Sequence, residues 1–125
     1  FKNKSPYMLM VSQINKNKKI FLENNEKEKQ GLEMLNIKRS VVPAITHVDY
    51  SARIQTVNED NNKKFYNLLK EFYNNTDCPL LVNTSFNVRD EPIVCTIEDA
   101  YKCFLLTDID VLVIENCFML KEDQI

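Results

Sequence analysis

The order of apolar segments along the second half of the chain predicts an α/β fold. After a polar break at residues 58–62, apolar side chains recur at the three- and four-residue spacing of a helix face. Pro79 then opens a strand-length apolar run, and Thr96 starts a second helix with acidic residues in its first turn. Residues 111–114 form a continuous apolar run, which predicts a strand buried on both faces. Strands that alternate with helices in this way predict an α/β fold with a mixed, twisted sheet and two main helices.

Three segments in the first half of the chain have the composition of strands. Residues 7–11 form a short apolar run, and residues 41–48 are rich in β-branched side chains. Residues 51–57 alternate, which predicts a half-polar strand with Arg53 and Gln55 on one face. This strand would present a guanidinium and an amide along the same face.

Residues 15–39 separate the first two of these segments. Lys, Asn and Glu occur there in mixed order, which is typical of a solvated loop. We expect a surface excursion with one helical turn near residues 26–35, and we place no chemistry in it.

Length and charge argue against several classes of protein. With 125 residues, of which 44% are hydrophobic and 27% charged, the chain suits one globular domain. The net charge of −2 argues against a general nucleic-acid binder, which normally carries a basic excess. No apolar run approaches the length of a membrane span. Because the first residue is Phe1 rather than Met, we expect the chain to be part of a longer protein.

The four cysteines lack both the paired spacing and the histidine partners of a zinc site. They lie in apolar or mixed surroundings, which predicts buried, reduced thiols in a cytoplasmic protein. The four are Cys78, Cys95, Cys103 and Cys117, and the single histidine is His47. We therefore expect a cytoplasmic location and no metal site in this chain.

The densest group of hydrogen-bonding side chains follows the apolar run of residues 80–82. Asn83, Ser85, Asn87 and Arg89 occur within seven positions, before a second apolar run begins. Donors at the tip of a buried strand lie where α/β proteins usually bind ligands. Asn and Ser offer neutral hydrogen bonds, and Arg offers a fork that fits phosphate or carboxylate. We therefore predict a site here for a phosphorylated or carboxylated small molecule.

Two further side chains are candidates for the same site. His47 lies in the polar stretch of residues 46–53, which ends at Arg53. An alternative remains open for each of three candidates: a hydrogen-bonded structural role for His47, a surface ion pair for Arg53, and an exposed turn charge for Arg89.

Several reaction mechanisms lack the residues that they need. No order of Ser, His and Asp indicates a nucleophilic triad. The acids Asp49, Asp90 and Glu91 all stand near turns, where acids are common for local reasons. Gly31 is the only glycine, which excludes a phosphate loop of the Walker or dinucleotide type. What remains is a site of neutral donors and guanidinium groups that would position and stabilise an anion.

Several long motifs resemble, in one order, the carbamoyltransferases, including the nodulation-factor type and the antibiotic-tailoring O-carbamoyltransferases. The central match is the segment of residues 83–94, in which Asn-Thr-Ser-Phe-Asn-x-Arg-x-Glu-Pro-Ile-Val stands. The other matching segments are residues 5–9, 46–49, 51–57, 98–100 and 107–113. The resemblance covers nearly the whole chain except residues 15–39.

The resemblance implies both a fold and an activity. It implies that residues 1–125 are the C-terminal part of a YrdC-like domain, which in this family forms carbamoyl-adenylate from carbamoyl phosphate and ATP. A larger N-terminal domain with an actin-like ATPase fold, missing from this chain, would then transfer the carbamoyl group to a substrate hydroxyl and hold the metal ion. This chain alone would be an incomplete carbamoyltransferase.

By motif match, the resemblance assigns Arg53 and Ser85 to the binding of carbamoyl phosphate or its adenylate. Arg53 would neutralise phosphate charge as the carbamoyl group moves. Ser85 and Asn83 would hydrogen-bond carbamoyl or phosphate oxygens and fix the angle of attack. In addition to Arg53 and Ser85, the residues expected to bind substrate are His47, Asn83, Asn87 and Arg89.

One departure from the family pattern stands beside this site. The pattern has Gly after the arginine, whereas this chain has Asp90. If that position has a positive φ, Asp is among the better substitutes, but its charge would stand next to an anion site. Reduced or altered activity is therefore expected.

Two other functions remain open. A stand-alone accessory module, which binds a small molecule or pairs with a separate transferase chain, would show the same sequence features. An RNA-binding relative is a further alternative, because YrdC-like proteins include factors of tRNA modification, but the net charge of −2 argues against it.

Overall fold

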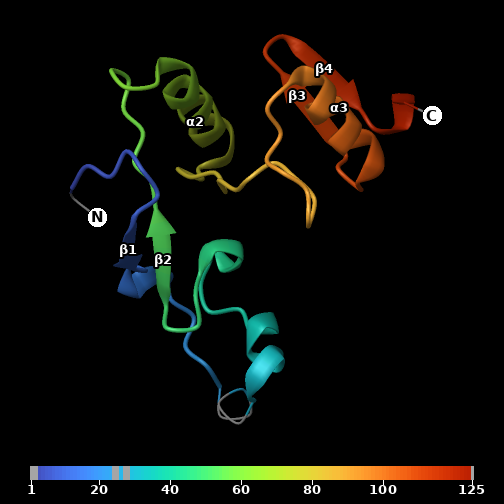
Figure 1. Ribbon diagram of the computed structural model, residues 1–125. Helices are drawn as coiled ribbons and strands as arrows, with labels where there is room; N and C mark the ends of the chain where they lie inside the picture. The colour runs from blue at the N-terminus through green and yellow to red at the C-terminus, as the bar shows by residue number, and fades with distance from the viewer. Residues whose placement is uncertain (1–2, 24–25, 27–28, 125) are drawn as a thin grey trace. The chain divides into compact units, whose positions relative to one another are not determined.

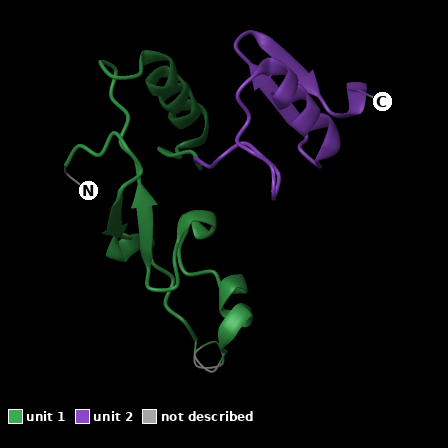
Figure 2. Ribbon diagram, viewed as in Figure 1, with its two compact units in different colours: residues 1–82 green, residues 83–125 purple. Residues whose placement is uncertain are grey.

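The computed structural model describes residues 3–23, 26 and 29–124 and divides into two compact units (Figure 2). Unit 1 is Phe1–Val82 and unit 2 is Asn83–Ile125. Each unit has its own strands and its own main helix, and each is described by itself.

One antiparallel strand pair forms the sheet of unit 1. β1 (Met10–Gln13) pairs with β2 (Ser51–Ile54), and Val11 stands opposite Arg53 (Figure 1). Ala52 is buried, whereas Arg53 on the opposite face is exposed, because successive side chains of a strand point to opposite faces. The half-polar strand predicted from the alternation is therefore confirmed over these residues.

The strand predicted at residues 7–11 starts later, at Met10. Buried Ser5 holds the preceding segment in a different way. Its backbone N–H donates to Oγ1 of Thr56 at 2.7 Å, and its hydroxyl donates to the carbonyl oxygen of Tyr7 at 2.9 Å. The backbone N–H of Thr56 also donates to the carbonyl oxygen of Ser5 at 2.7 Å, so Ser5 is tied to the residues that follow β2 without being part of a strand.

Residues 41–48, which are rich in β-branched side chains but interrupted by Pro43, do not form a strand. A 3-10 helix, Pro43–Ile45, stands there, with the proline in its first turn. Proline has no N–H for a ladder, and its fixed φ suits the start of a helix. The hydroxyl of Thr46 donates to the carbonyl oxygen of Val42 at 2.8 Å and closes the turn.

Two further 3-10 helices occupy the long polar segment of unit 1, at Lys16–Lys18 and Gly31–Asn36. The helical turn predicted near residues 26–35 is therefore confirmed in its second half, and residues 27–28 lie outside the described part of the chain.

Helix α2 (Lys63–Thr76) follows the polar break, as predicted. The side chain of Asn62 caps it by accepting the backbone N–H of Phe65 at 3.1 Å. Asp77, with a left-handed φ of 56°, ends it. No side chain of α2 is fully buried, so its apolar stripe is a half-covered face in this unit and not a closed core.

Unit 2 consists of a helix beside a hairpin. α3 (Ile97–Leu106) contacts β3 (Val111–Ile114), which pairs with β4 (Cys117–Leu120) (Figure 1). The buried side chains of this unit are all apolar: Ala100, Cys103, Phe104 and Leu112. The expectation that residues 111–114 are buried on both faces is wrong, because Val113 is 60% exposed. With one helix as its cover, this hairpin buries a single face.

Both ends of α3 are capped by side chains. Thr96 and Asp99 form a capping box, in which each side chain accepts the other's backbone N–H at 3.1 and 3.2 Å. At the other end, Nζ of Lys121 donates to the carbonyl oxygens of Phe104, Leu105 and Thr107 at 2.7, 2.7 and 3.0 Å. A lysine there complements the negative end of the helix dipole. The helix start predicted from the sequence is confirmed.

The predicted class, α/β with two main helices, is confirmed. Within the described residues, the strands form two separate antiparallel pairs. Residues 79–82 have no regular secondary structure and pair with no strand of the described chain, so the strand predicted after Pro79 is wrong. An apolar run becomes a strand only where a neighbour supplies the other half of the ladder.

The composition led to expectations about the cysteines and about membrane-spanning segments. All four cysteines are free, but Cys95 and Cys117 are exposed, so burial was predicted wrongly for these two. In the described part of the chain, no helix has the length and apolar character that a bilayer crossing requires.

Candidate functional site

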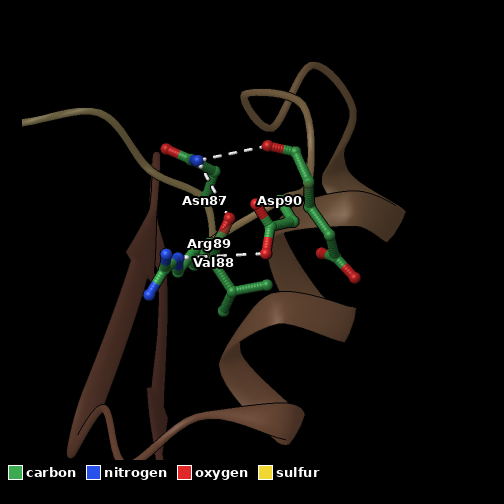
Figure 3. A network of polar contacts seen from close by, with 5 residues as sticks. Asn87, Val88, Arg89 and Asp90 are labelled. Atoms are coloured by element: carbon green, nitrogen blue, oxygen red, sulfur yellow. Dashed lines mark hydrogen bonds and ion pairs between the residues drawn. The ribbon is translucent and has the colours of Figure 1, made fainter.

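The polar motif of unit 2 lies in a segment without helix or strand and makes a tight turn (Figure 3). Nδ2 of Asn87 donates to the carbonyl oxygens of Val88 and Glu91 at 3.0 and 3.2 Å. The backbone N–H of Val94 donates to the carbonyl oxygen of Phe86 at 2.9 Å and closes the loop. The amide hydrogens of Asn87 therefore organise the turn, and its Oδ1 remains as an acceptor.

The tip of this turn carries two opposite charges. Nε of Arg89 lies 3.9 Å from Oδ2 of Asp90, and the two side chains are 95% and 92% exposed (Figure 3). A pair this exposed contributes little to stability. Asp90 has a φ of 68°, so the backbone at this position is left-handed. Glycine tolerates this conformation best, and Asp is among the side chains that follow it.

Asn83 and Ser85 precede the turn on the same segment, and both are exposed. The hydroxyl of Ser85 makes no hydrogen bond to the described residues, so it keeps both its proton and its lone pairs for a ligand.

Arg53 lies on β2 of unit 1 and is anchored at one point. Its Nη2 donates to the carbonyl oxygen of Met8 at 2.7 Å, and Nε2 of Gln55 donates to that of Pro6 at 2.8 Å. None of the ion pairs between described residues involves Arg53. The surface ion pair that was open as an alternative is therefore absent from the described residues, and an exposed, oriented guanidinium keeps most of its five N–H groups for an anion.

His47 belongs to a chain of three side chains in the turn before β2. Its Nδ1 lies 2.9 Å from Oγ of Ser51, and that hydroxyl donates to Oδ1 of Asp49 at 2.6 Å. The backbone N–H of Ser51 donates to the same carboxylate oxygen at 3.0 Å. These bonds from Ser51, its hydroxyl first, hold the pKa of Asp49 below its ordinary value. Ser51 itself is buried.

Sequence reasoning did not single out Asp49 and Ser51 as partners of His47. A usable signal was present: an acid two residues before a serine is the spacing at which a carboxylate accepts the N–H of an Asx turn. The left-handed Tyr50 between them, with a φ of 64°, makes this tight turn.

Arg39 of unit 1 was also missed. It is buried at 3% exposure, and its Nη1 donates to the carbonyl oxygen of Ile37 at 3.1 Å. Its Nε and Nη2 have no partner among the described residues. These two atoms form the side-on fork that takes a carboxylate or phosphate, and a buried, unpaired charge is costly. Composition carries no signal of this kind, because it depends on burial.

The structure groups the predicted residues in two sets. His47 and Arg53 lie in unit 1, whereas Asn83, Ser85, Asn87 and Arg89 lie in unit 2. The convergence of the two sets on one ligand stays a prediction.

A cavity of about 480 Å³ lies in unit 1 at the end of β2. Its lining is Pro6, Tyr7, Gln55, Thr56, Val57, Asn61, Asn62 and Phe65. Arg53 and His47 are not part of this lining, and both side chains are exposed. Among the described residues, no group of three His, Cys, Asp or Glu side chains has the arrangement of a metal site.

Comparison with known proteins identifies the family. Residues 1–121 match the family described as carbamoyltransferase C-terminus, and the chain belongs to this family. An uncharacterized protein of Synechocystis sp. is 54% identical over 120 residues, which are 96% of this chain and 20% of that protein. Nodulation protein NolNO of Sinorhizobium fredii is 43% identical over 84 residues, 67% of this chain and 12% of that protein. Nodulation protein NolO of Bradyrhizobium diazoefficiens is 47% identical over 77 residues, 62% of this chain and 14% of that protein. The chain thus spans a fifth or less of the length of these relatives.

Proposed function

We propose that this chain is part of a carbamoyltransferase and contributes to the site that forms carbamoyl-adenylate from carbamoyl phosphate and ATP. The observation that carries the proposal is the family match over residues 1–121. The donors that the sequence motifs share with this family support the finer assignment.

We assign to Arg53 the role of neutralising the negative charge of the substrate phosphate. Its exposed guanidinium is oriented by the bond to the carbonyl oxygen of Met8, and it has no acidic partner among the described residues. A guanidinium held in this way stabilises negative charge without having to be reoriented during the reaction.

The residues of unit 2 receive complementary roles. We assign Ser85 and Asn83 to hydrogen bonds with carbamoyl or phosphate oxygens, since both are exposed. Asn87 shapes the turn that follows and offers its Oδ1, and Arg89 adds positive charge at the tip.

The reaction has a definite balance. Carbamoyl phosphate loses its phosphate, one water molecule is consumed, and an oxygen of the resulting carbamate bonds to the α-phosphorus of ATP as pyrophosphate leaves. A substrate hydroxyl then takes the carbamoyl group and AMP departs. The role proposed for this chain is to hold and neutralise the phosphorylated substrate, because Arg53 and Ser85 offer hydrogen-bond donors to its oxygens.

We propose that the hydroxyl acceptor and the metal ion bind to an N-terminal transferase domain. The relatives are at least five times as long as the matched segment, which leaves room for such a domain in them. We also propose a cytoplasmic location, which four free cysteines support.

Calorimetric titration of the full-length gene product with carbamoyl phosphate tests the proposal. Loss of a charged hydrogen bond in Arg53→Gln is expected to weaken binding about 10- to 100-fold. The control is Lys70→Gln, which removes one positive charge from the exposed face of α2 and is expected to leave the affinity within about twofold. Equal affinity in wild type and Arg53→Gln would overturn the assignment of Arg53.

A second measurement addresses the adenylation step. Pyrophosphate release from ATP should depend on carbamoyl phosphate and fall at least about tenfold in Ser85→Ala. An equal rate of pyrophosphate release with and without carbamoyl phosphate would overturn the proposed reaction, even if carbamoyl phosphate binds.

A further inference from the structure

The turn before β2 holds three hydrogen-bonding side chains in a fixed order. Three side chains are joined in series, from His47 through Ser51 to Asp49, by contacts of 2.9 and 2.6 Å. Backbone bonds across the same turn hold the series in place: the N–H of His47 donates to the carbonyl oxygen of Ser51 at 2.8 Å, and that of Tyr50 donates to the carbonyl oxygen of His47 at 3.0 Å.

The direction of the first bond follows from chemistry. An ionised carboxylate only accepts, and the bonds from Ser51 keep the pKa of Asp49 low. The hydroxyl proton of Ser51 therefore points at Asp49. Its oxygen is then left as an acceptor for His47, so Nδ1 of the ring carries the proton.

The other ring nitrogen, Nε2, lies outside this series of contacts. In a neutral imidazole with a proton on Nδ1, Nε2 is a hydrogen-bond acceptor. Nε2 of His47 has no partner among the described residues, and the side chain is exposed. In its neutral form the ring thus presents an oriented acceptor, in contrast to the guanidinium of Arg53, which can only donate.

We propose that Nε2 of His47 accepts a hydrogen bond from the amino group of the carbamoyl moiety, so that this turn selects carbamoyl phosphate over acyl phosphates without an amine. The inference rests on the proposed function. A phosphate dianion and a carbonyl oxygen offer only lone pairs, so the N–H₂ is the one part of carbamoyl phosphate that needs an acceptor. Ser51 and Asp49 act as positioning residues, because they set which ring nitrogen holds the proton.

Acetyl phosphate is the matching probe, because a methyl group replaces the N–H₂ and the rest of the molecule is the same. A site built to accept a hydrogen bond discriminates against the analogue that lacks the donor. The quantity to measure is the ratio of the two dissociation constants, acetyl phosphate over carbamoyl phosphate, by calorimetry on the full-length gene product. A purely structural role would move both constants together and leave the ratio unchanged.

The expected ratio is about 10 or more in the wild type and close to 1 in His47→Leu. His47→Gln should restore part of the preference, because its Oε1 can accept. Ser51→Ala should lower the ratio and Ser51→Thr, which keeps the hydroxyl, should retain it. The control is Ser12→Ala on β1, a serine outside this series, which should keep the wild-type ratio.

The outcomes separate the two proposals. Binding of both compounds with a ratio that His47→Leu does not change overturns this inference and leaves the proposed function standing. Absence of carbamoyl phosphate binding overturns the proposed function and this inference with it. A ratio that falls in His47→Leu and recovers in His47→Gln supports both.

Discussion

The interior of unit 1 and the interior of unit 2 are stabilised by different kinds of interaction. In unit 2 every buried side chain is apolar, and Phe104 has no exposed surface. In unit 1 the buried residues are mostly polar or charged, with Ile37 and Ala52 as the apolar ones. The buried polar residues of unit 1 are Ser5, Arg39, Ser40 and Ser51.

This difference matters because apolar burial mainly stabilises a fold, whereas buried hydrogen bonds also orient side chains. Burial of apolar surface is strong but has no direction, whereas a buried hydroxyl must meet its partners at a defined distance and angle. Unit 1 therefore orients side chains such as His47, and unit 2 provides a compact support for an exposed polar segment.

The largest effect is expected in the apolar unit. Phe104→Ala removes a fully buried ring and should lower the free energy of unfolding by about 3–5 kcal/mol. Phe118→Ala is the matched control, because this ring on β4 is 66% exposed and should cost less than about 1 kcal/mol. Urea denaturation measures both, and hydrogen exchange of the α3 amides should accelerate only in the first variant. Equal losses in the two variants would contradict the apolar core assigned to unit 2.

The polar unit should respond to a single hydroxyl. Ser40 is fully buried, accepts the backbone N–H of Val42 at 2.9 Å and contacts the hydroxyl of Thr46 at 2.7 Å. Ser40→Ala leaves that N–H without a partner and should cost about 1–3 kcal/mol of unfolding free energy. Ser12→Ala, a serine of β1 without such partners, should change it by less than about 0.5 kcal/mol. A cost for Ser40→Ala as small as that of the control would mean that hydrogen bonds do not hold unit 1.

The same contrast explains how far the sequence could predict this fold. The capping box at Thr96 and the cap at Asn62 were readable, because a cap depends on neighbours three residues away. The absence of a strand after Pro79 could not be predicted, because a strand requires a pairing partner that the sequence does not specify. The burial of Val113 was misjudged for a related reason: an apolar run cannot say how many of its faces are covered.

The candidate site shows the same division. Arg53 and Ser85 could be selected from their residue types and motif, and both are exposed side chains of the expected chemistry. The hydrogen bonds that join Ser51 to His47 and to Asp49, and the buried fork of Arg39, depend on geometry within unit 1. Residue type identified the donors, whereas the acceptor role proposed for His47 depends on contacts that only the structure gives.

Two left-handed residues offer a smaller test, one in each unit. Asp90 and Tyr50 have φ values of 68° and 64°, and an L-residue there costs about 1–2 kcal/mol. Asp90→Gly removes this strain from an exposed tip and should stabilise the protein by up to about 1 kcal/mol and tighten carbamoyl phosphate binding, because a negative charge leaves the site.

Tyr50→Gly should change stability by less than about 1 kcal/mol, because relief of strain is offset by lost contacts. The ring of Tyr50 lies 6.1 Å from that of Phe21 and 5.1 Å from Nζ of Lys19, and such contacts contribute about 0.5–1.5 kcal/mol each. Thermal denaturation and calorimetry compare the two variants. Stabilisation by Tyr50→Gly greater than by Asp90→Gly would show that the ring contacts of unit 1 contribute nothing, and unchanged affinity in Asp90→Gly would remove Asp90 from the site.

The smallest effect is a pH dependence that both units share. Hydrogen bonds from Ser51 lower the pKa of Asp49, and bonds from Thr96 lower that of Asp99, in each case from an ordinary value of 3.8. When the folded pKa lies below the unfolded one, the unfolded state binds more protons, so the stabilisation is complete above the unfolded pKa and is lost as pH falls through the folded pKa. Asp49→Asn and Asp99→Asn should therefore each flatten the acid limb of the stability curve between about pH 2 and 6. Side-chain carboxyl shifts measured by NMR should give midpoints below 3.8 for both, and a midpoint at or above that value for Asp49 would break the proton assignment on which the acceptor role of His47 depends.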